Sequence, residues 1–219
     1  MTFFNYTVPP LRRKQPCVDV QELQGVWLVD LRIGNTTVYS TFYTRVDQAC
    51  ILWSLILGAM FATAQFFPLN WSLQALLWSA LTLIGTAAMV FWTEFWVRVE
   101  RVQWVLYCWA ILMVVGLIVT NCAILLGWGE VLIRLCPLWL GLSALGYLCT
   151  GLGVRSRAIL LVGVIHLVSI PFLSYFGSWQ FLLTGGVMAC TLLLLAQWQW
   201  DMRSPLDRDL LTPKHKQLN

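Results

Sequence analysis

The sequence predicts an all-α polytopic membrane protein with six transmembrane helices and with both termini in the cytoplasm. Composition supports this class, because hydrophobic residues make up 59% of the chain and charged residues only 11%. In soluble proteins about a quarter of the residues are charged. The apolar residues form long runs, and the basic residues lie in the short polar segments between those runs.

Six of the apolar runs are long enough to cross the hydrocarbon core, which takes about 20 helical residues for roughly 30 Å. Helices are expected because backbone N–H and C=O groups in lipid must be paired within their own segment. Tryptophan is frequent near the ends of these runs, as is typical of the membrane–water interface; this predicted belt includes Trp71, Trp128, Trp139 and Trp200. The predicted spans cover residues 49–67, 71–92, 104–128, 135–153, 158–175 and 178–200.

The distribution of lysine and arginine predicts the orientation. Five of these residues precede the first span, two lie at 98–101, two lie at 155–157 and four follow the last span. All of these segments face the same side, and only Arg134 falls on the other. The positive-inside rule then places both termini in the cytoplasm. The host membrane is expected to be the cytoplasmic (plasma) membrane or an internal energy-transducing membrane.

Three regions follow along the chain. Residues 1–48 form a cytoplasmic arm and hairpin, residues 49–200 the six-helix bundle, and residues 201–219 a cytoplasmic tail. Within the first region, residues 26–46 are rich in Val, Thr and Tyr around Gly34-Asn35, a pattern that predicts a hairpin of two short strands. Because an isolated hairpin is only marginally stable, it should contact the bilayer surface, the inner loops or another protein.

Small residues at helical spacing indicate how the helices pack. Lipid gives helices no hydrophobic reason to associate, so close approach through small side chains and interhelical hydrogen bonds must hold them together. In the fourth predicted span the small residues fall on one face; they are Ser143, Gly146, Thr150 and Gly153.

His166 is the one histidine inside a span, no Asp, Glu, Lys or Arg lies inside one, and such a residue is a functional-site hypothesis by default. The fourth span runs antiparallel to the fifth, and at the depth of His166 in the membrane it presents Tyr147 and Ser143. A hydrogen bond from the imidazole to one of these two side chains is therefore expected. Pro171 lacks an N–H and should kink the helix just beyond the histidine. A polar path or buried polar cluster is therefore predicted from His166, Tyr147, Ser143, Asn121 and Thr120, with Asn121 either part of the path or, as we favour, a hydrogen bond between helices.

No metal site or cofactor is predicted, because no other His, Asp or Glu lies deep in a span to supply a second ligand. For serine chemistry the sequence offers Gly141-Leu142-Ser143-Ala144, which resembles the nucleophile segment of the rhomboid intramembrane proteases. The rest of that pattern differs: Ala144 stands where the family has a glycine, the histidine lies in the fifth span rather than the sixth, and the first outer loop is very short. No catalytic residue is predicted.

The leading functional hypothesis is an accessory, assembly or anchoring subunit without catalytic activity. Its expected partners are the lipid bilayer and another protein, or a second copy of the chain, bound through the cytoplasmic face. Nucleic acid is not expected, because the basic residues do not gather on one soluble surface. The alternative is a small permease or channel-like transporter with a path near His166, and an intramembrane enzyme using Ser143 is third.

Overall fold

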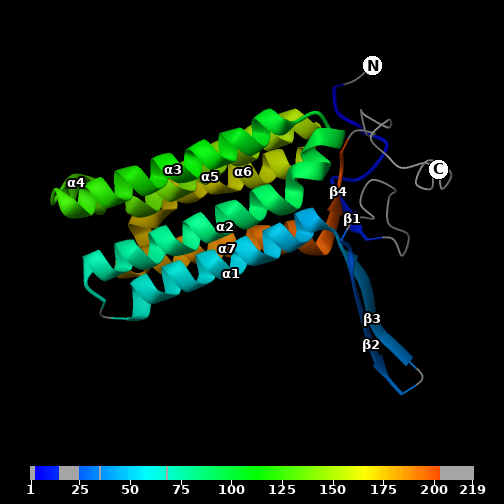
Figure 1. Ribbon diagram of the computed structural model, residues 1–219, viewed down its shortest axis with the longest axis horizontal. Coiled ribbons are helices and arrows are strands. Elements are labelled where there is room, and N and C mark those ends of the chain that lie inside the picture. Colours follow the sequence, from blue (N-terminus) through cyan, green and yellow to red (C-terminus); the bar gives the residue numbers. More distant parts are fainter. Residues whose placement is uncertain (1–2, 15–24, 35, 68, 203–219) are drawn as a thin grey trace.

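The computed structural model describes residues 3–14, 25–34, 36–67 and 69–202. Most of these residues are helical, and the longest helices lie side by side along one axis (Figure 1). The predicted tail falls outside the described residues from position 203 onward. The helices are α1 (Arg45–Phe66), α2 (Trp71–Val99), α3 (Gln103–Leu125), α4 (Gly129–Leu132), α5 (Leu135–Val154), α6 (Arg157–Phe172), the 3₁₀ segment η2 (Leu173–Trp179) and α7 (Gln180–Gln197).

Five helical stretches among the described residues are long and apolar enough to cross a membrane, which agrees with a multi-pass membrane protein. The fifth stretch, Arg157–Gln197, has 41 residues and contains both α6 and α7. Gly177 interrupts it with a φ of 51° and a ψ of −118°. Figure 1 shows α6 and α7 lying along the bundle axis on either side of this interruption.

The helices form two groups. α1 packs most extensively on α7 and also on α2, α5 packs most extensively on α6 and also on α3, and α2 joins the groups through α3. The core includes Phe61, Trp78, Trp139 and Leu140, all fully buried. Trp139 was expected in the interfacial belt, but its ring stands edge-on to that of Trp78 with 6.3 Å between centroids. It lies one turn inside α5, so the bundle rather than the interface surrounds it.

The small residues of α5 allow a neighbouring helix to pack closely against it, as the sequence predicts. A Cβ atom placed on Gly146 would lie 2.6 Å from the ring of Trp109 on α3. The indole N–H of Trp109 donates to Thr150 Oγ1 at 2.9 Å, one turn further along the same face of α5. Close approach and an interhelical hydrogen bond therefore join α3 to α5 at adjacent positions.

The predicted hairpin is present as β2 (Trp27–Ile33) and β3 (Thr36–Tyr43). The strands are antiparallel, with Trp27 opposite Tyr43 and Ile33 opposite Thr36, and the register shifts once between Leu31 and Arg32. Gly34 has a φ of 60° in the turn, a conformation that glycine adopts without strain. Figure 1 shows the hairpin extending sideways from one end of the bundle, beyond the helices.

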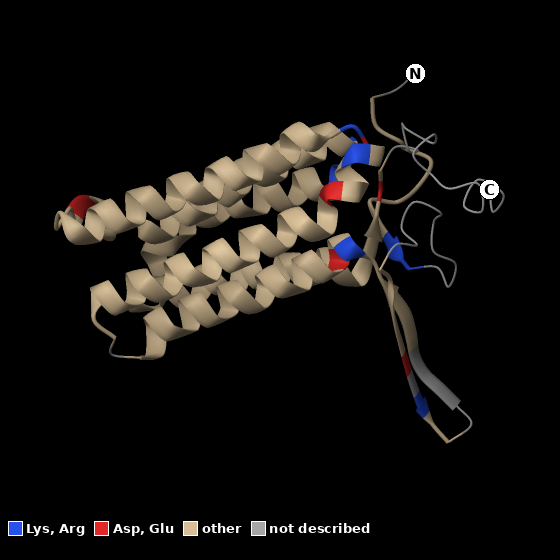
Figure 2. Cartoon of the chain, in the orientation of Figure 1, with Lys and Arg blue, Asp and Glu red and all other residues tan. Residues whose placement is uncertain are grey.

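A second pair of strands was not predicted. β1 (Leu11–Arg13) pairs antiparallel with β4 (Trp198–Trp200), so the N-terminal segment lies against the chain just after α7. Residues 198–200 had been assigned to the last span, but the helix ends at Gln197 and Trp198 is extended. Figure 2 shows that the charged residues of the long helices lie at this same end of the bundle, whereas α4 carries an acidic residue at the opposite end. We call the end next to β1 and β4 the charged end.

Candidate functional site at the charged end

The structure places His166 beside Tyr147, as predicted, with 4.9 Å between the ring centroids. The predicted hydrogen bond is not the one formed, because the imidazole Nδ1 lies 2.8 Å from the carbonyl oxygen of Val162 one turn earlier in α6. The imidazole is therefore hydrogen-bonded to the backbone of its own helix. Pro171 lies in the last turn of α6, and the α-helix changes to η2 after Phe172.

The remaining members of the predicted cluster separate into two places. Ser143 and Tyr147 line a cavity in the bundle, whereas Thr120 and Asn121 of α3 do not, and Asn121 lies where α3 packs on α2. The Asn121 side-chain amide donates to Ser79 Oγ at 3.0 Å and to the carbonyl of Leu117 at 2.9 Å. Asn121 therefore joins two helices, and the structure does not bring it into one path with His166.

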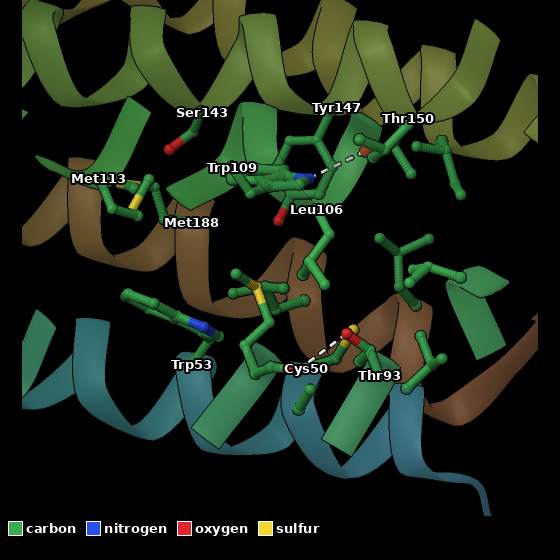
Figure 3. Close-up of a pocket in the computed structure, with 18 of the residues that line it drawn as sticks. Cys50, Trp53, Thr93, Leu106, Trp109, Met113, Ser143, Tyr147, Thr150 and Met188 are labelled. Atoms are coloured by element: carbon green, nitrogen blue, oxygen red, sulfur yellow. Dashed lines mark hydrogen bonds between the residues drawn. The ribbon is translucent and has the colours of Figure 1, made fainter. Parts of the chain in front are cut away.

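The cavity lies between the two groups of helices and has a volume of about 150 Å³. Figure 3 shows Trp109, Tyr147 and Thr150 on one side and Cys50, Trp53 and Thr93 on the other. Its lining also includes Val46 and Trp200, so it reaches the charged end. Nearly all of the atoms that face it are apolar or aromatic.

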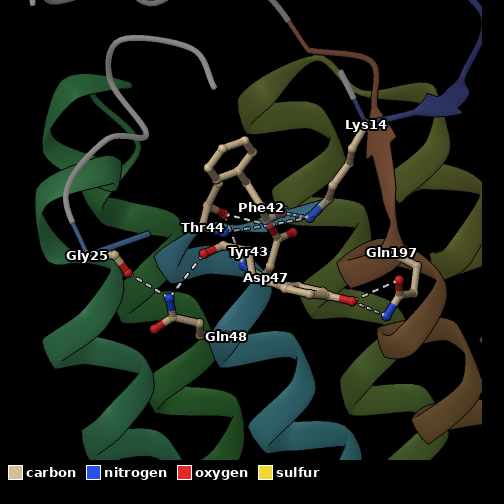
Figure 4. A network of polar contacts seen from close by, with 8 residues as sticks. All are labelled: Lys14, Gly25, Phe42, Tyr43, Thr44, Asp47, Gln48 and Gln197. Carbon is tan, nitrogen blue, oxygen red and sulfur yellow. Dashed lines mark hydrogen bonds and ion pairs between the residues drawn. The ribbon is translucent and has the colours of Figure 1, made fainter. Parts of the chain in front are cut away.

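A network of buried polar contacts holds the base of the hairpin at the charged end (Figure 4). Lys14 forms an ion pair with Asp47, and its ammonium group also donates to the carbonyl of Phe42 at 3.1 Å. The Asp47 carboxylate accepts from the backbone N–H of Thr44 at 2.8 Å, while Thr44 Oγ1 accepts from the N–H of Asp47. This capping box begins α1 at Arg45, four residues earlier than predicted. Only Thr44 therefore separates the end of β3 from the start of α1.

Two further contacts complete this network. The Gln48 side-chain amide donates to the carbonyl oxygens of Gly25 and Tyr43, at 2.7 and 3.1 Å. The Tyr43 hydroxyl is hydrogen-bonded to the side chain of Gln197 at the end of α7. Both strands of the hairpin are thus tied at their base to α1 and α7.

Asp201 forms a second buried anchor directly after β4. Its carboxylate accepts from Ser156 Oγ at 3.1 Å, from the Ala158 N–H at 3.1 Å and from the Arg157 guanidinium at 2.8 Å. The carboxylate is fully buried at the N-terminus of α6, where the helix dipole also favours a negative charge. Arg157 additionally donates to the carbonyl of Val8, so the N-terminal segment is bound at the same point.

The sequence analysis missed both anchors. The role of Asp47 could have been predicted from the sequence, since Thr44-Arg45-Val46-Asp47 before an apolar run is a capping-box pattern. No local pattern predicts the role of Asp201, because the residues that bind it lie more than 40 positions earlier in the chain.

The hairpin carries exposed apolar side chains both next to its base, where Trp27 and Leu28 pair with Tyr43 and Phe42, and beside its turn at Ile33. Trp27, Leu28 and Ile33 have exposed fractions of 55%, 57% and 75%. Within the described residues, neither outer edge of the hairpin pairs with another strand. The hairpin therefore combines a fixed base with apolar side chains and free backbone groups in solvent.

The fold and these contacts define a class: a helical protein with several apolar helices that are compatible with multiple membrane crossings. Comparisons with protein-family models, with curated proteins and with solved structures found no match to this chain. Within the described part of the chain, no group of three or more His, Cys, Asp or Glu side chains could hold a metal ion.

Proposed function

We propose that this protein is a non-catalytic docking subunit with six membrane crossings, which uses its hairpin to hold a partner protein at the cytoplasmic face. α6 and α7 count as separate crossings in this proposal, since each lies along the bundle axis and Gly177 divides them. The basic residues at the charged end favour the cytoplasmic side for the hairpin and for both termini. The plasma membrane and an internal energy-transducing membrane both satisfy this orientation.

One observation carries the proposal: three large apolar side chains are exposed on a hairpin whose base is fixed by buried polar contacts. Burying such a side chain contributes about 1.5–3 kcal/mol relative to leaving it in water. The hairpin is already ordered at its base, so binding incurs little further loss of conformational entropy. Its free edges suit strand addition, in which backbone hydrogen bonds supply affinity and alternate side chains supply specificity.

The direction of the hairpin favours a membrane protein as the partner. The hairpin extends sideways from the bundle rather than along its axis (Figure 1). In a membrane it would therefore reach over the area next to the bundle, where the cytoplasmic loops of a neighbouring subunit lie. A second copy of this chain is a partner of the same kind, because two hairpins can pair edge to edge.

The proposal predicts that polar substitutions on the hairpin release the partner. Trp27→Thr, Leu28→Thr and Ile33→Thr together keep β-forming residues but remove exposed apolar side chains from both faces of the hairpin. Copurification after mild solubilisation, quantified by mass spectrometry, should then lose at least ten-fold of a stoichiometric partner that the unchanged protein retains.

A matched control uses the same residue types at the opposite end of the bundle. Trp128, Leu126 and Ile133 are comparably exposed there, and their replacement by threonine should leave the partner bound. An unchanged protein that purifies as a monomer without any partner would contradict the proposal. Partner retention in the hairpin variant would contradict it as well.

A transporter with a path near His166 is the second candidate, favoured by one observation: His166 is fully buried beside Tyr147, and its Nε2 has no hydrogen-bond partner among the described residues. If the ring is structural, His166→Ala should lower the free energy of unfolding by about 2–4 kcal/mol through the cavity that it leaves. His166→Leu, which fills most of that space, should recover much of the loss.

Thermal unfolding in detergent and proton flux in proteoliposomes, measured on the same preparations, separate the two candidates. We expect the alanine variant to unfold at a lower temperature and the basal flux to equal that of empty liposomes for every variant. Flux in the unchanged protein that disappears in both variants would favour the transporter instead.

A further inference from the structure

We propose that Cys108 of α3 and Cys149 of α5 form a modification site, at which hydrogen peroxide oxidises the two thiols to a reversible disulfide. The inference does not depend on the docking function. It rests on the register of the two helices, on the contact between the two thiols and on their partial exposure at the surface of the bundle.

The helices α3 and α5 are antiparallel and closely packed. A Cβ atom on Gly153 would lie 2.9 Å from Val105, near the charged end. One on Gly116 would lie 3.0 Å from the ring of Trp139, further along the same pair of helices. Glycines on both helices therefore let the backbones approach each other. This matters because a disulfide requires Cα atoms about 4.4–6.8 Å apart.

The register of this packing sets the two cysteines level with each other. The Trp109 ring lies against Gly146, and its N–H donates to Thr150, so Trp109 stands at the height of residue 148, midway between them. Because the helices are antiparallel, the residue before Trp109 is level with the residue after 148. Those two residues are Cys108 and Cys149.

The side chains of this pair also point toward each other, and the Cys108 thiol lies next to the Cys149 thiol. Equal height alone does not bring two thiols together. By the same register, Cys122 of α3 is nearly level with Cys136 of α5, but the Cys136 thiol faces Thr184 of α7 instead. Register and side-chain direction together therefore single out Cys108 and Cys149.

Both thiols can be reached by a small molecule. Cys108 and Cys149 are partly exposed and neither lines the cavity, so their exposed atoms lie on the outside of the bundle, whereas Cys136 is buried. Cys108 comes five residues after the start of α3, and Cys149 comes five residues before the end of α5. Each is therefore about 7.5 Å along its helix from the charged end, at 1.5 Å per residue. Hydrogen peroxide is small and uncharged, and suits this position.

The oxidation proceeds in two balanced steps. In the first step, one thiol sulfur attacks a peroxide oxygen, the O–O bond breaks, and a sulfenic acid and one water form. In the second step, the other sulfur attacks the sulfenic sulfur, the S–S bond forms, and the hydroxyl group leaves as a second water. The two sulfurs lose two electrons to the peroxide, and both thiol protons end in water.

The product suits its surroundings because a disulfide is uncharged and tolerates an apolar environment. Small thiols reverse it by exchange. Disulfides in contact with the cytosol are usually transient for this reason. The disulfide would therefore fasten α3 to α5 only while peroxide is present.

The test follows the disulfide in the full chain in detergent. Reduced protein is treated with hydrogen peroxide, blocked with N-ethylmaleimide, denatured and cleaved with trypsin. Cleavage after Arg134 separates α3 from α5, so fragments joined by a disulfide come apart only when dithiothreitol is added. The unchanged protein should give the joined fragments, and should unfold at a higher temperature after oxidation because the disulfide restricts the unfolded chain.

Two double variants provide the matched comparison, since each removes one cysteine from α3 and one from α5. Cys108→Ser with Cys149→Ser should form joined fragments at least about ten-fold more slowly than the unchanged protein, because the proximity of the two thiols is lost. Cys122→Ser with Cys136→Ser should form them as fast as the unchanged protein. Cys108→Ala with Cys149→Ala repeats the first variant without a hydroxyl group, so that one poorly folding protein does not end the experiment.

Three results would overturn the inference. Joined fragments that persist in the variants without Cys108 and Cys149 would assign the disulfide to other cysteines. Disulfide-linked dimers whose yield rises with protein concentration would place the bond between two molecules. Sulfinic acid at Cys108 or Cys149, without joined fragments, would mean that the second thiol does not reach the first.

Discussion

Replacing Asp201 with alanine should lower the free energy of unfolding by about 3–5 kcal/mol, the range found when one partner of a buried ion pair is removed. The carboxylate is fully buried, so its loss leaves the Arg157 guanidinium without its charge partner. The hydroxyl of Ser156 and the N–H of Ala158 lose their acceptor at the same time. Each unpaired donor in a buried position adds to the cost.

The measurement is equilibrium unfolding in mixed micelles, followed by tryptophan fluorescence. Asp201→Asn keeps one carbonyl oxygen but not the charge, so its stability should fall between those of the unchanged protein and the alanine variant. Asp30→Ala is the matched control, because the pair of Asp30 with Arg32 is exposed and such pairs contribute about 1 kcal/mol or less. Equal losses in Asp201→Ala and Asp30→Ala would show that the buried anchor is not important for stability.

Gly146→Val is the second substitution from which we expect a large loss, about 2–4 kcal/mol. The new Cβ would lie 2.6 Å from the Trp109 ring, so α3 and α5 must separate or the ring must turn. Overpacking of this kind costs about 1–3 kcal/mol. Turning the ring also breaks its hydrogen bond to Thr150, which is worth about 1 kcal/mol.

Gly141 supplies the control for this substitution in the same helix. A Cβ atom on Gly141 would meet nothing within 4 Å, so Gly141→Val introduces the same β-branched residue into α5 without a clash. Thermal unfolding of the two variants in the same detergent then isolates the helix contact. A lower unfolding temperature for Gly141→Val than for Gly146→Val would contradict this account of how α3 and α5 pack.

The sequence predicts most of what depends on local pattern. The apolar runs, the seam around Gly146 and the hairpin around Gly34 are all properties of neighbouring residues, and the structure has each of them. The ends of the elements were less accurate. α1 begins at Arg45 rather than 49 because Thr44 and Asp47 cap it, and α2 continues to Val99 rather than 92.

What could not be predicted depends on distant parts of the chain. The pairing of β1 with β4 joins two three-residue strands almost the whole chain apart, and neither strand has a pattern of its own. Trp139 stands near a span end, where an interfacial position is usual, and only the packing of Trp78 against it shows that it is buried. The members of the predicted polar cluster were placed by depth alone. Depth is correct for His166 and Tyr147, and the favoured role of Asn121 as a hydrogen bond between helices is confirmed, but depth did not show that its partner is Ser79 of α2.

The pairing of β1 with β4 also sets an order of events during synthesis. Leu11–Arg13 emerges first from the ribosome but cannot find its partner until Trp198–Trp200 has been made. The bond between Tyr43 and Gln197 at the base of the hairpin has the same requirement. A hairpin that is fully anchored therefore reports that the whole bundle has been inserted. If the hairpin is the surface that binds a partner, incomplete chains lack its final form, and assembly is restricted to finished molecules.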